Sequence, residues 1–131
     1  EPTVVAVSIE DNRVVAVGSD YELSRLQPLE SLGMEMLEAA VVPHDQYGQP
    51  LTVRDLSVYR CLAKAVSVPT IVPSQKRILP EEVALLGATG LRAVMIGAIV
   101  TGKEASTIES VTRTFREAVE DFRRLSDSRE V

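Results

Sequence analysis

The fold is decided by residues 68–125, VPTIVPSQKRILPEEVALLGATGLRAVMIGAIVTGKEASTIESVTRTFREAVEDFRRL. Short apolar runs alternate here with segments whose apolar residues recur every three or four positions. The order indicates strand, loop, helix, strand, glycine-bearing loop and long helix. Basic and polar residues gather just after each apolar strand. This alternation predicts an α/β domain with a parallel sheet, and an anion-sized site at the rim where the strands end.

Proline and glycine residues indicate where the helix in this stretch begins and ends. One strand covers residues 70–72, and the next buried strand covers residues 91–96. Pro80 is the expected first residue of the helix between them, since a proline at that position loses no hydrogen bond. Gly87 or Gly90 is expected to end that helix, because glycine readily adopts the left-handed conformation that closes many helices.

A long amphipathic helix closes the stretch. Thr101 with Glu104 three residues on has the pattern of a capping box, so the helix is expected to begin there. Its opposite face is rich in arginine and glutamate. The apolar stripe predicts docking on the sheet rather than a coiled-coil seam. The stripe consists of Ile108, Val111, Phe115, Ala118, Phe122 and Leu125.

An antiparallel hairpin is expected at the start of the chain. Residues 3–9 and 14–17 are apolar runs rich in β-branched residues, and residues 10–13 between them form an Asp/Asn turn. A second capping-box pattern, residues 19–22, then predicts a short helix from near Asp20. The helix is expected to be interrupted at Gln27-Pro28 and to be closed by Gly33.

A first strand-to-helix unit follows the hairpin region. Residues 36–42 are nearly all apolar, as in a strand buried on both faces. Residues 43–50 form the loop after it, and Thr52 with Asp55 starts a helix that runs to about Val66. The apolar stripe of this helix is expected to be Val53, Leu56, Ala63 and Val66.

Composition limits the classes of protein to which the chain can belong. With 131 residues, 45% hydrophobic and 25% charged, it is expected to form one globular domain. A net charge of −5 argues against nucleic acid as a partner, and no run approaches the ~20 apolar residues of a membrane span. Cys61, the single cysteine, cannot form an internal disulfide, so a cytoplasmic location is expected. The chain starts at Glu1 with neither Met nor leader, as a piece of a longer protein does.

These segments together predict a single α/β domain over residues 1–131. Its mostly parallel sheet is expected to carry helices on its faces, with an N-terminal β-hairpin followed by three βα units. Residues 1–33 hold the hairpin and short helices, residues 34–125 the three units, and residues 126–131 a frayed tail. Two architectures fit this order, a partial barrel-like sheet and an open doubly wound sheet.

The run PTIVPSQKRILPEEVALLGATGLRAVMIGAIVTGKEA, residues 69–105, resembles the closing two units of the phosphate-binding (βα)8 barrels. These include indole-glycerol-phosphate synthase, thiamin-phosphate synthase and the sugar-phosphate epimerases. The resemblance implies that the amides of Gly97 and Ala98 contact phosphate and that Ser74 and Gln75 hold its other side. Those families usually have a glycine where this chain has residues 73–75, and the chain is too short for a barrel of about 250 residues. A half-barrel that pairs with another copy reconciles the length, so a homo-oligomer is expected.

Two other folds share parts of this pattern. Residues 97–104 fit the spacing of a nucleotide-binding P-loop, but Glu104 stands where Ser or Thr would ligate Mg²⁺, which disfavours nucleotide hydrolysis. Receiver-like domains place Asp, Ser or Thr, and Lys at successive strand ends, as Asp45, Ser74 and Lys103 are expected to lie. Receivers begin with an acidic pair after the first strand, whereas residues 10–11 here fall in the expected turn.

The expected site combines residues from three loops at the rim of the sheet. His44, Asp45 and Lys76 are the catalytic candidates, as proton handlers or, for Lys76, as a Schiff-base amine. Neighbouring residues on an extended strand face opposite ways, so only one of Lys76 and Arg77 is expected to face the site. One His and one Cys give no metal cluster, and no metal or cofactor is expected. The phosphate-binding candidates are Ser74, Gln75, Arg77, Gly97, Ala98, Thr101, Gly102 and Lys103.

This reading predicts binding of a small anionic metabolite, phosphorylated or carboxylated, at the strand-end rim. Its conversion in isomerase, aldolase or synthase style is the expected chemistry if the protein is an enzyme. The alternative is a non-catalytic regulatory or assembly domain that uses the same rim or its helix faces. No membrane partner is expected.

Overall fold

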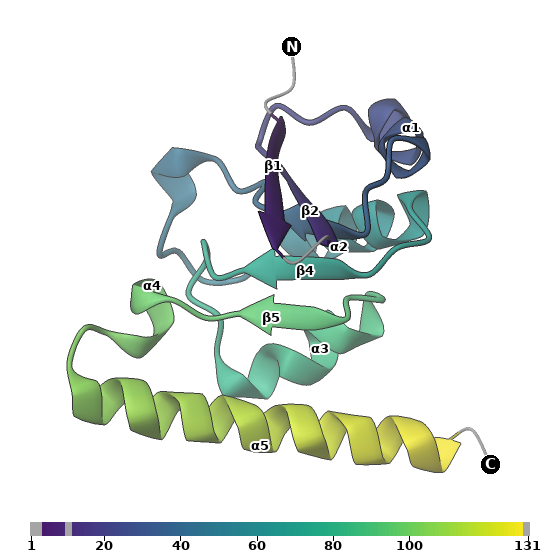
Figure 1. Ribbon diagram of the computed structural model, residues 1–131. Helices are drawn as coiled ribbons and strands as arrows, with labels where there is room; N and C mark the ends of the chain where they lie inside the picture. Colours follow the sequence, from purple (N-terminus) through teal and green to yellow (C-terminus); the bar gives the residue numbers. More distant parts are fainter. Residues whose placement is uncertain (1–3, 10–11, 130–131) are drawn as a thin grey trace.

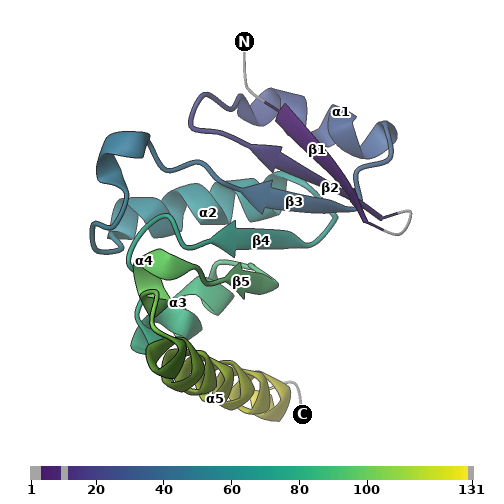
Figure 2. The same ribbon diagram turned by 60° about the vertical axis from the view of Figure 1, so that its left-hand side comes forward.

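The computed structural model describes residues 4–9 and 12–129, and it contains a five-stranded sheet with strand order β1-β2-β3-β4-β5 (Figures 1 and 2). β1 pairs antiparallel with β2, whereas β2, β3, β4 and β5 pair in parallel. The α/β fold with a mostly parallel sheet is therefore as the sequence predicts. The strands are β1 (Val4–Ile9), β2 (Asn12–Val17), β3 (Met36–Ala39), β4 (Thr70–Pro73) and β5 (Ala93–Met95).

Helical segments alternate with the parallel strands, as expected for βα units. Within the described residues, three of them are short 3₁₀ turns, and the last helix is much longer than the others. The α-helices are α1 (Leu26–Ser31), α2 (Val53–Ala65), α3 (Val83–Ala88), α4 (Ala98–Thr101) and α5 (Ala105–Arg129), and the 3₁₀ turns are η1 (Leu23–Arg25), η2 (His44–Gln46) and η3 (Pro80–Glu82).

The predicted hairpin is confirmed, with Val4 opposite Val17 and Ile9 opposite Asn12. Asn12 and Arg13, placed in the turn by the sequence, belong to β2 instead. The other two expected turn residues, 10 and 11, lie outside the described part of the chain. Strand pairing therefore extends closer to the turn than the β-branched pattern indicates.

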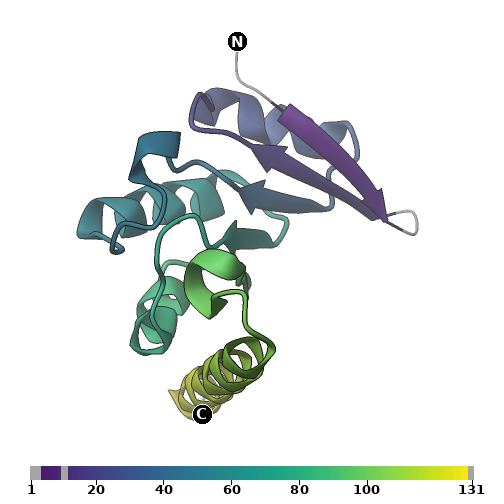
Figure 3. The ribbon, with the colours of Figure 1, turned by 90° about the vertical axis from the view of Figure 1, so that its left-hand side faces the viewer.

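The strand order distinguishes the two architectures that the sequence left open. A doubly wound sheet or a receiver-like sheet requires the order to reverse, whereas β2 to β5 follow one another without reversal. Consecutive parallel strands with right-handed crossovers place every connecting helix on the same side of the sheet. Figures 2 and 3 show α1, α2 and α3 on one side, so the strand expected at residues 36–42 is covered by helices on one face and not on both.

Buried and less buried residues alternate along the strands, as expected for a sheet that helices cover on one face. Val15, Val17, Leu37 and Val72 point toward the helices and are buried against Leu26, Leu62 and Leu86. The residues between them are only half-buried or exposed. We call these residues the open face of the sheet: Val14, Ala16, Met36, Glu38, Ile71, Ala93 and Met95.

Two expected helix starts are wrong. Glu22 makes no capping hydrogen bond and instead pairs with Arg25, so the first α-helix begins at Leu26 rather than near Asp20. Pro28 then lies in the first turn of α1, where its missing N–H has no partner to lose, and it does not interrupt the helix. Thr101 likewise does not cap α5, because it is the last residue of α4.

The long helix α5 packs on other helices rather than on the sheet, contrary to the sequence expectation. It lies along α3 and also contacts α4 and η3 (Figures 1 and 2). Only part of its stripe is covered: Phe115 is buried, but Ile108 and Leu125 are 42% and 60% exposed. The helix also continues to Arg129, through most of the tail that the sequence predicts to be frayed.

In α2 the residue Val53, expected in the apolar stripe of that helix, is 82% exposed.

Glu30 in α1 fastens that helix to the loop between α2 and β4. Its carboxylate accepts hydrogen bonds from the backbone N–H of Ser67, from the Ser67 hydroxyl and from the backbone N–H of Val68. The bond from the Ser67 backbone is the main cause that lowers the pKa of Glu30, opposed by desolvation. Folding therefore favours the charged carboxylate.

We expect the Glu30 contribution to be complete above the ordinary carboxyl pKa and to be lost as pH falls through the lowered pKa. Urea unfolding of the wild type and of Glu30→Gln, compared from about pH 7 to about pH 3, measures it. The variant is expected to be less stable at neutral pH, with the difference shrinking as acid is added. Glu35→Gln, an exposed charge loss nearby, is the control. A difference that stays constant with pH would contradict this role.

Candidate functional site

A cavity of about 540 Å³ lies at the carboxyl ends of the strands, under the loops that follow β2 and β3 and beside the first turns of α2. Its charged lining residues are Arg54, Asp55 and Lys76. The remaining lining residues are Ser19, Tyr21, Val41, Val42, Pro43, Gln46, Thr52, Val58 and Tyr59. The rim therefore carries a cavity where the parallel topology predicts one.

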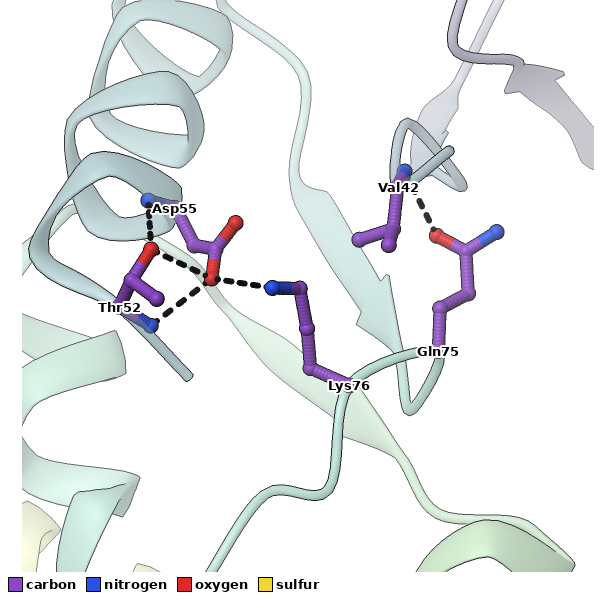
Figure 4. Close-up of polar contacts among 5 residues, drawn as sticks. All are labelled: Val42, Thr52, Asp55, Gln75 and Lys76. Atoms are coloured by element: carbon purple, nitrogen blue, oxygen red, sulfur yellow. Dashed lines mark hydrogen bonds and ion pairs between the residues drawn. The ribbon is translucent and has the colours of Figure 1, made fainter. Parts of the chain in front are cut away.

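Lys76 reaches this cavity because side chains alternate along the segment that leaves β4. Ser74, Lys76 and Ile78 are buried, whereas Arg77 is exposed. The sequence predicts that only one of the two basic neighbours faces inward, and that one is Lys76. Figure 4 shows its side chain directed toward α2, away from the side to which Gln75 points.

Asp55 meets Lys76 from the first turn of α2. The Lys76 Nζ and Asp55 Oδ2 atoms are 3.3 Å apart, and the two side chains are only 4% and 15% exposed. The same carboxylate accepts the backbone N–H and the hydroxyl of Thr52, at 2.8 and 2.9 Å. The Thr52 hydroxyl accepts the Asp55 N–H in return, which completes the predicted capping box. Helix capping therefore holds the carboxylate in place for the ammonium (Figure 4).

Tyr59 lies one turn after Asp55 on the same side of α2 and lines the cavity. Its side chain is 1% exposed, and its hydroxyl has no hydrogen-bond partner among the described residues. Burial, with a smaller effect of the Asp55 charge, raises the pKa of Tyr59 far above the ordinary value. The phenol is therefore a neutral donor at physiological pH.

We expect Tyr59→Phe to stabilise the protein by about 1 kcal/mol, because it removes a buried hydroxyl that lacks a partner. Tyr47→Phe is the matched control, since the Tyr47 hydroxyl accepts a hydrogen bond from Gln75 Nε2 at 2.9 Å. That variant is expected to lose about 0.5 kcal/mol. Urea midpoints of the two variants should shift in opposite directions. A loss of stability in Tyr59→Phe would show that the hydroxyl is hydrogen-bonded in solution.

Ser74 and Gln75, expected to hold phosphate, tie neighbouring loops together. The Ser74 hydroxyl accepts the backbone N–H of Gly97 at 2.8 Å. The Gln75 Oε1 atom accepts the backbone N–H of Val42 at 3.1 Å (Figure 4). These groups order the loops after β3, β4 and β5 with respect to one another. Neither side chain lines the cavity.

The segment 97–103, expected to be a phosphate-binding loop, contains several internal hydrogen bonds. Residues 98–101 form the helical turn α4, and the N–H groups of Val100 and Thr101 donate to the Gly97 carbonyl. The Thr101 hydroxyl donates to the Gly97 and Gly102 carbonyls. The N–H groups of Val100 and Thr101 and the Thr101 hydroxyl therefore have partners within the segment. Ala98, Gly102 and Lys103 are exposed, and none of them lines the 540 Å³ cavity.

His44 and Asp45, the expected proton handlers, lie in the exposed turn η2. The ring of His44 packs near that of Tyr47, with centroids 4.7 Å apart. The cavity is lined by Pro43 and Gln46 from the same loop, but not by His44 or Asp45. Of the three catalytic candidates, the structure thus places only Lys76 at the cavity.

The sequence alone did not place two residues at the cavity that line it together with Lys76, namely Asp55 and Tyr59. The sequence identifies Asp55 only as part of the predicted helix start, and Tyr59 is not among the residues that it singles out. The available signal was positional: a helix that directly follows a strand-end loop begins at the same rim as the site. An acidic residue in its first turn, with a tyrosine four residues later, then shares one helix face.

Three further findings concern metal ligands, membrane-spanning helices and similar proteins. Among the described residues, no group of three or more His, Cys, Asp or Glu side chains is arranged to hold a metal ion. In the same part of the chain, no helix combines the length and the apolar character needed to cross a membrane. Comparisons with models of protein families, with curated proteins and with solved structures find no match.

Proposed function

We propose that this protein binds a small anionic metabolite in the cavity at the carboxyl ends of β3 and β4, and that it converts this metabolite there. The observation that supports this best is Lys76, a residue that is only 3% exposed and lines the cavity. Asp55 is its one ion-pair partner among the described residues and takes one of its three N–H donors. The other donors are available to a phosphate or carboxylate.

The charge of the cavity supports an anionic ligand. Arg54 and Lys76 contribute two positive charges and Asp55 one negative charge, a balance of 2 − 1 = +1. The whole chain carries a net charge of −5, so this local balance is opposite in sign to the rest. Polar side chains around the charges, from Ser19, Thr52 and Gln46, suit a hydroxylated metabolite.

Thermal unfolding against phosphate, sulfate, sugar phosphates, carboxylates and nucleotides tests the proposal. A ligand at about 100 times its dissociation constant should stabilise the fold by roughly 2.7 kcal/mol. Lys76→Ala is expected to abolish the shift and Arg54→Ala to reduce it. Lys103→Ala, which removes an exposed lysine outside the cavity lining, is the matched control and should keep the shift. No shift with any anion would overturn the proposal.

A non-catalytic assembly domain is the second candidate, favoured by the open face of the sheet. Parallel sheets are normally covered on both faces, and this face is apolar except for Glu38. A second copy of the chain offers an equally apolar face, as an isologous dimer requires. Sedimentation should then show a dimer in the wild type and a monomer in Ala93→Glu. A monomeric wild type would reject this candidate.

A further inference from the structure

We propose that Lys76 forms an imine with an aldehyde or ketone group of the anionic metabolite. The inference rests on the proposed function and specifies its substrate class, an anion that also carries a carbonyl group. The chain has three lysines, Lys64, Lys76 and Lys103. Lys64 and Lys103 are exposed, whereas Lys76 is buried in a cavity wall. A buried amine in a cavity wall can form an imine with a bound carbonyl compound when a neighbouring group accepts its proton.

The position of Asp55 suits proton transfer to and from the amine. Attack on a carbonyl carbon requires the neutral amine, and the Asp55 Oδ2 atom lies 3.3 Å from Nζ. The Thr52 hydrogen bonds and the capping box fix the carboxylate at this distance. Asp55 can therefore take a proton from the ammonium without moving the helix.

The reaction balances within these groups. Asp55 accepts one proton from the Lys76 ammonium, and the amine lone pair forms a C–N bond to the carbonyl carbon. The carbonyl oxygen takes the second N–H proton, which gives a carbinolamine. Protonated Asp55 then returns its proton to the hydroxyl, the C–O bond breaks and water leaves. The net change is ammonium plus carbonyl to iminium plus water, and Asp55 ends as a carboxylate.

Tyr59 supplies a neutral hydrogen-bond donor on the same cavity wall. Its hydroxyl is buried without a partner among the described residues, which is costly unless a ligand group completes it. The developing oxyanion of the carbonyl is such a group, because a neutral phenol donates to it strongly. The cavity of about 540 Å³ limits the metabolite to a small molecule.

Trapping with pyridoxal 5′-phosphate and sodium cyanoborohydride tests the inference, with the labelled lysines located by peptide mass mapping. The probe joins an aldehyde to a phosphate, so bound probe presents its carbonyl to the cavity amine. Labelling of Lys76 is expected to be at least about tenfold faster than labelling of Lys64 or Lys103. Pyridoxal, which keeps the aldehyde and lacks the phosphate, should lose this preference. Labelling of Lys76 no faster than of the exposed lysines would overturn the inference.

A second measurement separates the imine from anion binding. Pyridoxine 5′-phosphate has the ring and the phosphate but no aldehyde, and its effect on the melting temperature reports binding alone. Lys76→Arg keeps the positive charge but cannot form an imine, so it should keep the shift and lose the selective label. Tyr59→Phe should keep the shift and slow the labelling. A shift without selective trapping rules out the imine and leaves the proposed function standing, whereas no shift with this probe or with any anion of the panel rules out both.

Discussion

Replacing Asp55 by alanine is expected to lower the free energy of unfolding by about 3–5 kcal/mol, because the change leaves the buried Lys76 ammonium without its partner. Two further hydrogen bonds are lost with the carboxylate, those from the N–H and the hydroxyl of Thr52. The loss of such a cap alone costs about 1 kcal/mol. The urea midpoint measures the total loss of unfolding free energy, provided that the slope of this free energy against urea concentration is the same in both proteins.

Two companion variants separate the ion pair from the cap. Asp55→Asn keeps an oxygen that can accept from Thr52 but removes the charge, so it isolates the pair. Lys76→Met should cost less than Asp55→Ala, since Asp55 is the more exposed partner and keeps both Thr52 donors. The double variant Asp55→Asn with Lys76→Met is expected to be more stable than Asp55→Asn alone, because no buried charge is then left without a partner. If Asp55→Ala and Lys76→Met lower the free energy of unfolding equally, water solvates the Lys76 ammonium once Asp55 is removed.

The sequence predicted the ends of several helices correctly where those ends depend only on residues within one helical turn. The capping box of Thr52 and Asp55 forms as expected, and Pro80 begins the turn that leads into α3. Gly33 and Gly90 have φ angles of +99° and +101° and follow the ends of α1 and α3. Each of these features needs only neighbours within one helical turn, so the sequence alone is enough.

The same kind of signal failed where a competing contact was available. Glu22 could have closed a capping box with Ser19, but it pairs with Arg25, at 2.8 Å. The Thr101 hydroxyl donates to the carbonyls of Gly97 and Gly102 and so is not a cap for α5. The sequence shows which side chain can cap a helix. It does not show which of several nearby partners the folded loop brings closer.

The sequence was enough to predict that the candidate site lies at the strand-end rim, but not which residues meet there. Parallel strand order puts any site at the strand-end rim, and alternation along the segment after β4 turns Lys76 inward. The partnership with Asp55 depends on the path of the loop 43–52 over the rim. That path is set by long-range contacts, such as the Gly48 N–H to the Gln75 carbonyl and the Arg77 N–H to the Gln49 carbonyl. No local pattern encodes a contact between residues so far apart in the chain.

Replacing Phe115 by alanine is expected to lower the free energy of unfolding by about 3–5 kcal/mol, the usual cost of emptying a buried aromatic site. Phe115 is the most deeply buried residue of the α5 stripe, at 5% exposure, and lies in the hydrophobic core cluster. It also lines a cavity of about 290 Å³ between α5 and residues 77–80. Truncation therefore widens this open pocket and removes the contacts that the buried ring makes with its neighbours.

Leu125→Ala is the matched control, because it belongs to the same stripe but is 60% exposed. Its cost should stay within about 0.5 kcal/mol, as for most surface substitutions. Sequence periodicity treats Phe115 and Leu125 as equivalent, whereas α5 meets α3, α4 and η3 over part of its length only. The difference in urea midpoint between the two variants thus measures how much of the stripe is used. Equal losses would indicate that the exposed end of α5 is also covered in solution, as a dimer that includes this helix would require.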